Sequence, residues 1–441
     1  MEPEPEHEGT TLSLASYWRL VRSNRNFRCL WTAQIVSEVG DWFYTLAIYS
    51  LLLQLTGRAG SVALALVLQV LPQTFIGPTA GLINDRISRK KVMIMADLVR
   101  VVIVLLMLFV RSQATVWLVY PLLLFETLMA AFFEPARNSV IPNITVREDV
   151  ILANTLSSTT WSLNLMIGAT LGGVVAALLG RDAVFVLNAL SFLVSAFLVS
   201  RMRFSEPHAD SAAPLRAHEL VDFSPVLDGV RYVRGDRRLL ATVFAKAGEL
   251  MIGPSWVLFT VMGQKVFPVR WPGLDPQRGA MLGMSLLLGA RGLGALIGPL
   301  YSARLAGQSD RRLRLGILWG YVIVAVGYTA LGVAGNVWLA CLCVILAHCG
   351  GSTVWVFSTT LLQLHTGDRF RGRVFAADMA LSMLTIAIGA YLCGVFLDWG
   401  FSVRAVAIAT GLVMLIPVCL WGLALRLWTP GTAANALQSE Q

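Results

Sequence analysis

The sequence predicts an all-α membrane protein with twelve transmembrane helices arranged in two six-helix bundles. Its composition excludes an ordinary water-soluble globule, because 56% of the 441 residues are hydrophobic, only 14% are charged, and the mean hydropathy is +0.67. Twelve apolar runs reach the length of about 20 residues that a helix needs to cross a bilayer. A small-residue pattern repeated at one fixed offset indicates two similar halves.

The twelve runs fall into two groups of six. They lie at residues 28–55, 61–84, 92–110, 114–137, 152–179 and 182–200, and then at 238–264, 279–303, 313–334, 336–362, 373–398 and 402–427. We therefore divide the chain into an N-terminal tail (1–27), a first bundle (28–200), a linker (201–237), a second bundle (238–427) and a C-terminal tail (428–441).

Two short patterns recur 221 positions apart. Gly77-Pro78 returns as Gly298-Pro299, and the small residues of 168–173 return at 389–394. Each match is weak by itself, since glycine and alanine are common in membrane helices. Their shared offset favours two parallel halves of six helices.

The basic residues orient the chain. If both termini are cytoplasmic, 25 of the 35 Lys and Arg residues fall in or beside cytoplasmic segments, 7 lie outside and 3 lie within spans. This is the asymmetry expected of a multi-pass protein. The net charge of +9 is then topological, and we expect no nucleic-acid partner.

The linker contains one helical pattern. Ser224 suits an N-cap with Pro225 after it, and Val226, Leu227, Val230 and Val233 repeat at helical spacing. We predict a short amphipathic helix on the inner membrane face. The alternative is a flexible tether.

A dense charge cluster lies between the second and third runs, at residues 81–91. Gly81 permits a close helix approach, and Asp85 can face the positive N-terminal end of another helix. Arg86, Arg89 and Lys90 can pair with acids or with phospholipid headgroups. We interpret the segment as a gate, and a purely topological anchor is the alternative.

The first span carries a polar stripe. Gln34, Glu38, Asp41 and Thr45 are spaced by 4, 3 and 4 residues, which places them on one face of a helix. Such a stripe must face water or a partner. Two carboxylates one turn apart do not both ionise readily, so we expect one to carry a proton. A static ion pair with Lys246 or Arg291 is the alternative.

The fourth span holds two acids on a similar face. We expect Glu126 to line a cavity, and Glu134 to pair with Arg86 or Arg89 near the charged loop. Residues 134–137 instead suit the end of a helix, because a proline follows Glu134.

The second bundle has its own intramembrane polar residues. Lys246, Glu249 and Trp256 share a face, and the first two can neutralise each other. His348, Ser352, Trp355 and Thr359 share another face, where His348 is either functional or a packing residue. Arg291 and Asp378 are further candidates whose partners the sequence does not reveal, whereas Asp97 and Arg100 suit a local pair.

Enzymatic and metal sites have no sequence basis. The chain lacks a P-loop, a zinc-ligand cluster and a nucleophile elbow, which argues against ATP-driven transport and hydrolysis. The six cysteines form no metal or redox pair. We expect no enzyme activity, no cofactor and no metal.

Several segments together resemble a known family. Residues 26–28 with Trp31, together with residues 77–91, 133–137, 153–154 and 371–374, resemble the major facilitator branch that holds bacterial enterobactin exporters and macrolide efflux proteins. The resemblance implies a twelve-helix fold, alternating access, and a cavity between helices 1, 4, 7 and 10. Residues 168–173 also resemble the antiporter signature of helix 5, but Ala169 replaces its proline.

These observations predict a proton-coupled exporter of amphipathic organic compounds, such as drugs, in a bacterial inner membrane. The alternatives are a siderophore exporter, a lysophospholipid transporter, a nutrient importer, and a non-transporting scaffold or sensor. Its expected partners are a small-molecule substrate, protons and the lipid bilayer, and we expect a monomer.

The candidate residues fall into three sets. Those for proton coupling are Glu38, Asp41, Glu126 and Glu249; those for substrate are Gln34, Asp41, Thr45, Glu126, Lys246, Trp256, Arg291, His348, Ser352 and Trp355; those for gating are Gly81, Asp85, Arg86, Arg89, Lys90, Glu134 and Arg373.

Overall fold

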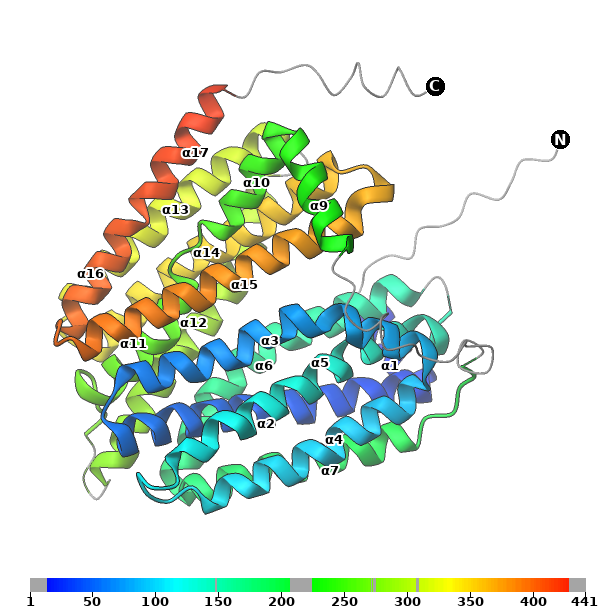
Figure 1. The fold of residues 1–441 in the computed structure, drawn as a ribbon, viewed down its shortest axis with the longest axis horizontal. Coiled ribbons are helices and arrows are strands. Elements are labelled where there is room, and N and C mark those ends of the chain that lie inside the picture. Colours follow the sequence, from blue (N-terminus) through cyan, green and yellow to red (C-terminus); the bar gives the residue numbers. More distant parts are fainter. Residues whose placement is uncertain are drawn as a thin grey trace. The chain divides into compact units, whose positions relative to one another are not determined.

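The fold is helical throughout the part of the chain that the structure describes. This computed structural model describes residues 14–146, 149–206, 224–270, 272, 275–306 and 309–427, and these contain helices but no strand (Figure 1). Ten of the helical stretches are long and apolar enough to cross a membrane. The prediction of an all-α, multi-pass membrane protein is therefore confirmed. Most of the two predicted tails lies outside the described residues.

The first half of the chain forms seven α-helices. They are α1 (Leu14–Ser23), α2 (Arg25–Thr56), α3 (Ala59–Arg86), α4 (Arg89–Leu106), α5 (Val119–Ile144), α6 (Val150–Leu179) and α7 (Arg181–Ser200). The short 3₁₀ turns η1 (Met107–Phe109) and η2 (Val116–Leu118) lie between α4 and α5. Gly57 and Gly180 end α2 and α6 with φ of 70° and 84°, values that only glycine adopts easily. The run predicted at 28–55 lies within α2, but polar side chains keep it out of the ten apolar stretches.

The second half begins at the linker. Its helices are α9 (Ser224–Gly235), α10 (Arg237–Ala247), α11 (Ile252–Lys265), α12 (Pro276–Ala306), α13 (Asp310–Val333), α14 (Val337–His365), α15 (Asp368–Asp398), α16 (Val403–Val413) and α17 (Leu415–Leu427). The run predicted at 238–264 is broken, because α10 ends at Ala247 and α11 begins at Ile252. The expected continuous helix is therefore wrong at residues 248–251. The helices α16 and α17 follow one another nearly in line (Figure 1).

The chain divides into two compact units. Unit 1 comprises residues 1–222 and 259–292, and unit 2 comprises residues 223–258 and 293–441. The boundary falls inside α12. Its first part belongs to unit 1, where a Cβ at Gly292 would touch Met166 of α6, and its last part belongs to unit 2, where Gly298 lies against Cys349 of α14.

Helix α9 occupies the position predicted for a linker helix. Its Tyr232 ring stacks on Phe370 of α15 with the centroids 4.5 Å apart, and Val233 is buried. Gly229 lies directly against the Arg373 backbone, where a Cβ would overlap the carbonyl group. The packed face differs from the predicted stripe, since Leu227 and Val230 are exposed. Close backbone approach at Gly229 sets which face is buried.

The repeated small residues have the same structural use in both copies. In unit 1, Gly168 of α6 lies against Trp42 of α2. In unit 2, Gly389 of α15 lies against Pro254 of α11. Small residues allow two membrane helices to approach closely. Gly81 differs, because a Cβ there would meet no atom of the described residues within 4 Å, and the close helix approach expected there stays a prediction.

These contacts predict a difference between two alanine substitutions. Gly253→Ala is expected to destabilise unit 2 by about 1–3 kcal/mol, because its Cβ would overlap the Ile386 carbonyl oxygen of α15. Gly81→Ala is the matched control and is expected to leave stability unchanged. Thermal unfolding of the purified variants in detergent measures both. An equal melting temperature for the two variants would contradict the tight α11–α15 contact.

Candidate functional site

Three clusters of ionisable side chains, most of them buried, lie among the helices. The Glu38 cluster comprises Gln34, Glu38, Glu134, Arg137 and Asn164; the Arg100 cluster comprises Asp41, Asp97, Arg100 and Glu126; the Lys246 cluster comprises Lys246, Glu249, Trp355, Thr359 and Asp378. The first two belong to unit 1 and the third to unit 2. Ionisable groups inside a membrane protein are a functional-site hypothesis by default.

In the Glu38 cluster the carboxylate is fully occupied by donors. Arg137 of α5 lies 2.8 Å from Glu38 Oε1, which also accepts a hydrogen bond of 2.8 Å from Gln34. Asn164 of α6 donates to Oε2 at 2.9 Å. Arg137 also contacts Glu134, at 2.7 Å. The cluster therefore joins α2, α5 and α6 through one saturated carboxylate, in a geometry that suits a structural ion pair.

This geometry corrects two predictions for the fourth span. Helix α5 continues through Pro135 and Pro142 to Ile144, so residues 134–137 do not end it. Glu134 pairs with Arg137 one turn further on, and not with Arg86 or Arg89. The static alternative for Glu38 named Lys246 or Arg291, whereas its partner is Arg137.

The Arg100 cluster gathers three acids around one base. Arg100 contacts Asp97 at 2.5 Å, as predicted for a local pair, and Asp41 of α2 at 3.8 Å. Its guanidinium lies over the rings of Phe133 and Phe192, 4.7 and 4.2 Å from their centroids. Arg100 is only 3% exposed. Aromatic faces on both sides hold the cation in one place.

Glu126 completes this cluster. It is buried in α5, it interacts electrostatically with Arg100 and Asp41, and its carboxylate makes no hydrogen bond or ion pair with the described residues. One oxygen of Asp41 is also buried without a hydrogen bond. Three acids share one cation, and burying the excess charge is unfavourable unless a proton neutralises part of it. Asp41 and Glu126 are the places where that proton would bind.

In the Lys246 cluster a different pair forms from the one predicted. Lys246 Nζ lies 2.8 Å from Asp378 Oδ2 of α15, donates to Thr359 at 3.1 Å, and lies 4.1 Å from the centre of the Trp355 ring. Lys246 and Asp378 are both almost completely buried. The pair joins α10 to α15, and its partner on α15 corrects the expected neutralisation of Lys246 by Glu249.

Glu249 lies in the break between α10 and α11. It is 2% exposed, and its Oε1 is buried without a hydrogen bond. Backbone bonds of the break are irregular, with Leu250 N–H donating to the Gly248 carbonyl at 2.7 Å. Interrupted helices at membrane depth occur where backbone lines a cavity or is buried in protein. The break also separates Trp256 from the helical face that Lys246 and Glu249 were predicted to share.

The remaining predicted substrate residues are divided between the two units. His348 Nε2 lies 3.1 Å from the Tyr328 hydroxyl of α13, and Ser352 bonds the Cys349 carbonyl at 3.2 Å within its own helix. Trp256 and Thr45 are partly buried on α11 and α2. Arg291 lies on α12 in unit 1 and interacts electrostatically with Tyr49.

The charged loop binds helix ends together within unit 1. Arg89 donates to the Asn84 carbonyl at 3.2 Å and to the Ser139 carbonyl of α5 at 2.9 Å, and Lys90 donates to the Met202 carbonyl at 2.7 Å. Glu206 accepts from the Arg89 backbone N–H at 2.8 Å, which places an anion at the N-terminus of α4. The basic residues thus join α3, α5 and the segment after α7 through backbone carbonyls.

The other predicted gate residues include Arg373 and Asp85. Arg373 of α15 pairs with Asp228 of α9 at 3.3 Å, which ties the linker helix to unit 2. The backbone at Asp85 is helical, but its side chain lies outside the described part of the structure, so its predicted role stays a prediction.

Sequence reasoning missed four partners in these networks: Arg137, Asn164, Tyr328 and Glu206. Asn164 lies inside an apolar run, and a polar amide at such a position indicates a hydrogen bond to another helix, so the sequence could have identified it. Glu206 lies 115 or more residues from the groups it caps, and no local pattern marks it.

Comparisons with known proteins agree on one class. A family model described as transmembrane secretion effector, one of the major facilitator models, matches residues 16–440. The chain is 25% identical over 416 residues to an uncharacterized major facilitator transporter, YfiS of Bacillus subtilis, covering 91% of this chain and 94% of the relative. It is 24% identical over 392 residues to macrolide efflux protein A of Streptococcus pyogenes, covering 86% and 90%. The crystal structure of the nucleoside transporter NupG shares the fold, with a TM-score of 0.70 at 11% identity, over 91% of this chain and 99% of that one.

Proposed function

The chain belongs to the transmembrane secretion effector family of the major facilitator transporters, and on that premise we propose that it is a proton-coupled exporter of amphipathic organic compounds. We further propose twelve membrane-spanning helices, with α10 and α11 together forming the seventh, in a bacterial inner membrane with both termini cytoplasmic. Transport proceeds by alternating access. Efflux is supported by the similarity to macrolide efflux protein A.

The excess of acids over bases in the Arg100 and Lys246 clusters carries the proposal of proton coupling. In the Arg100 cluster, Asp41, Asp97 and Glu126 share one guanidinium, and in unit 2 Glu249 is additional to the neutral Lys246–Asp378 pair. A carboxylate that has no dedicated cation is stable at this depth only when it binds a proton or a cationic substrate. If a proton and a cationic substrate compete for one carboxylate, binding of one releases the other, which is the simplest basis for exchanging them across the membrane.

The same charges favour a cationic substrate. An anionic siderophore would need Lys246, Arg291 and His348, but Lys246 is held by Asp378, and His348 is hydrogen-bonded to Tyr328. Aromatic residues occur on the same helices as the acids: Trp42 follows Asp41 in α2, and its ring is in edge contact with Trp161 of α6, with the centroids 6.3 Å apart. Acids and aromatic faces together suit the cationic nitrogen and apolar body of an amphiphilic amine.

A transport assay with an imposed pH gradient tests this function. Proteoliposomes with an acidic lumen are expected to accumulate a cationic dye such as ethidium, and a pH indicator inside is expected to report proton loss. Collapsing the gradient with an ionophore should stop accumulation. A protein that moved neither dye nor protons would be a scaffold, and accumulation that ignores the gradient would refute proton coupling.

A further inference from the structure

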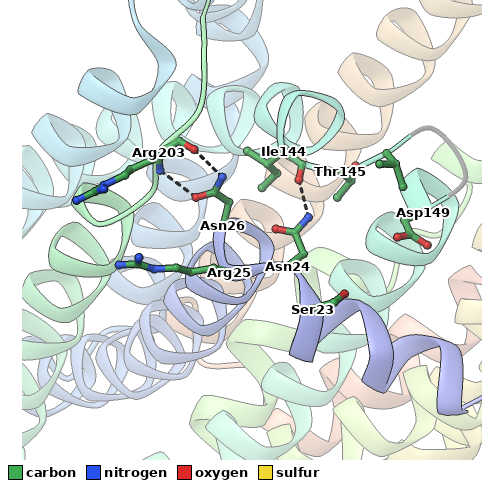
Figure 2. A pocket seen from close by; sticks show the side chains of 9 residues that line it. Ser23, Asn24, Arg25, Asn26, Ile144, Thr145, Asp149 and Arg203 are labelled. Carbon is green, nitrogen blue, oxygen red and sulfur yellow. Dashed lines mark hydrogen bonds between the residues drawn. The ribbon is translucent and has the colours of Figure 1, made fainter.

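A pocket with a volume of about 660 Å³ is lined by residues of unit 1 that belong to none of the three clusters (Figure 2). It is formed where α1 meets α2, where α5 leads into α6, and where the chain leaves α7. Its lining residues are Ser23, Asn24, Arg25, Asn26, Ile144, Thr145, Val146, Asp149 and Arg203. None of these belongs to the proposed transport residues.

Two asparagines build the walls. Asn24 caps α2 by accepting from the Phe27 N–H at 2.9 Å, while its amide donates to the Ile144 carbonyl at 2.6 Å. Asn26 bonds the Arg203 backbone twice, at 2.7 and 2.9 Å, as the dashed lines in Figure 2 show. These bonds tie the start of α2 to the end of α5 and to the segment after α7. The position of Arg203 is therefore fixed by Asn26.

The pocket carries a positive charge that nothing described offsets. The guanidinium groups of Arg25 and Arg203 extend to the same side in Figure 2, and neither has a partner among the described residues. The one acid of the lining, Asp149, is already paired with Arg19 at 3.3 Å. Two guanidinium groups at the mouth of a polar hollow suit an oxyanion, because arginine binds phosphate with paired, charge-assisted hydrogen bonds.

Helix α1 indicates the level of the pocket relative to a bilayer. Leu20 and Val21 are buried in the core of unit 1, whereas Trp18 is 62% exposed with Arg22 5.9 Å from its ring centre. An exposed tryptophan beside arginines on a short amphipathic helix is typical of the headgroup region. Basic pockets at this level bind anionic headgroups.

We infer that Arg25 and Arg203 hold a phosphate group in this pocket, supplied by an anionic phospholipid headgroup or by free phosphate. Asn26 acts as a positioning residue for Arg203. The site is separate from the proposed transport path, so its test does not depend on transport.

The test measures thermal stability of the purified protein in detergent with added phosphatidylglycerol, phosphatidylcholine or inorganic phosphate. Phosphatidylglycerol is expected to raise the melting temperature of the wild type more than phosphatidylcholine does. Arg25→Gln/Arg203→Gln is expected to weaken the apparent affinity about tenfold or more. Arg22→Gln/Arg201→Gln removes the same charge from exposed arginines outside the pocket and is expected to keep the response.

The phosphate and phosphatidylglycerol additions distinguish the two possible sources of the bound phosphate group. A shift with inorganic phosphate alone assigns free phosphate, and a shift with phosphatidylglycerol but not with phosphate assigns the lipid. Native mass spectrometry of the wild type tests lipid binding without any variant. One phosphatidylglycerol is expected to stay bound in preference to phosphatidylcholine. An equal response of both double variants, or a wild type indifferent to both phosphatidylglycerol and phosphate, would overturn the inference.

Discussion

Replacing Asp41 by Asn and Glu126 by Gln in one protein is expected to abolish pH-driven transport. Asp41 and Glu126 both interact with Arg100, the one cation of their cluster. Arg100 is already paired with the third acid, Asp97, at 2.5 Å. Neither replacement side chain can bind and release a proton near neutral pH. The one carboxylate left in the cluster, Asp97, is occupied by its ion pair with Arg100, so both proposed proton sites are lost and the proton gradient no longer drives substrate movement.

Exchange separates this effect from loss of binding. Exchange of labelled for unlabelled substrate at equal pH needs no net proton movement, so the double variant is expected to retain it in part. Proteoliposomes with and without a pH gradient measure both activities. Full gradient-driven accumulation by the double variant would show that neither carboxylate carries the proton.

Glu38→Gln is the matched control in the same helix. Its carboxylate accepts from Arg137, Gln34 and Asn164, so it is the buried one of the two carboxylates that offset Arg137. We expect this substitution to lower thermal stability, while gradient-driven transport by the protein that folds persists. The same substitution tests the earlier expectation that Glu38 shares proton coupling with Asp41. Uncoupling by Glu38→Gln with unchanged stability would reverse the two roles.

Lys246→Met is expected to cause the largest loss of stability, about 3–5 kcal/mol, because it leaves Asp378 buried and without its cation. Methionine keeps much of the apolar stem of lysine, so the loss reports the charge more than the volume. The melting temperature in detergent and the yield of monodisperse protein are the measurements.

A second substitution at the partner residue is expected to restore the stability that Lys246→Met loses. Lys246→Met/Asp378→Asn removes both charges and is expected to recover most of the lost stability, since no uncompensated charge remains. Lys246→Met/Glu249→Gln is the control, and it should recover little if Asp378 is the true partner. Equal rescue by the two double variants would restore the Lys246–Glu249 pair that sequence spacing suggested.

The helical fold was available from the sequence because its signals are local. A run of about 20 apolar residues leaves the backbone one way to satisfy its hydrogen bonds in a bilayer, so composition alone predicts helices. The predicted runs at 61–84 and 182–200 lie within α3 and α7. The break at residues 248–251 escaped this reasoning, since hydropathy does not report where a helix is interrupted.

The ionisable side chains of the site were also visible in the sequence, because each is exceptional in an apolar run. Spacing along one helix correctly paired Asp97 with Arg100. It also suggested Lys246 with Glu249; the two interact electrostatically, but Lys246 forms its ion pair with Asp378, because α10 ends between Lys246 and Glu249.

What the sequence determined by itself was therefore the class of protein, its membrane-spanning helices and the residues that carry charge into them. Only the tertiary structure decided which charges meet: Glu38 with Arg137, 99 residues away, and Lys246 with Asp378, 132 residues away. Burying an ionised side chain without a partner of opposite charge is unfavourable, so buried charges in these helices form ion pairs with other helices. The partner is chosen by helix packing, where residues such as Gly253 set how closely α11 and α15 approach, and no pattern along one helix encodes that choice.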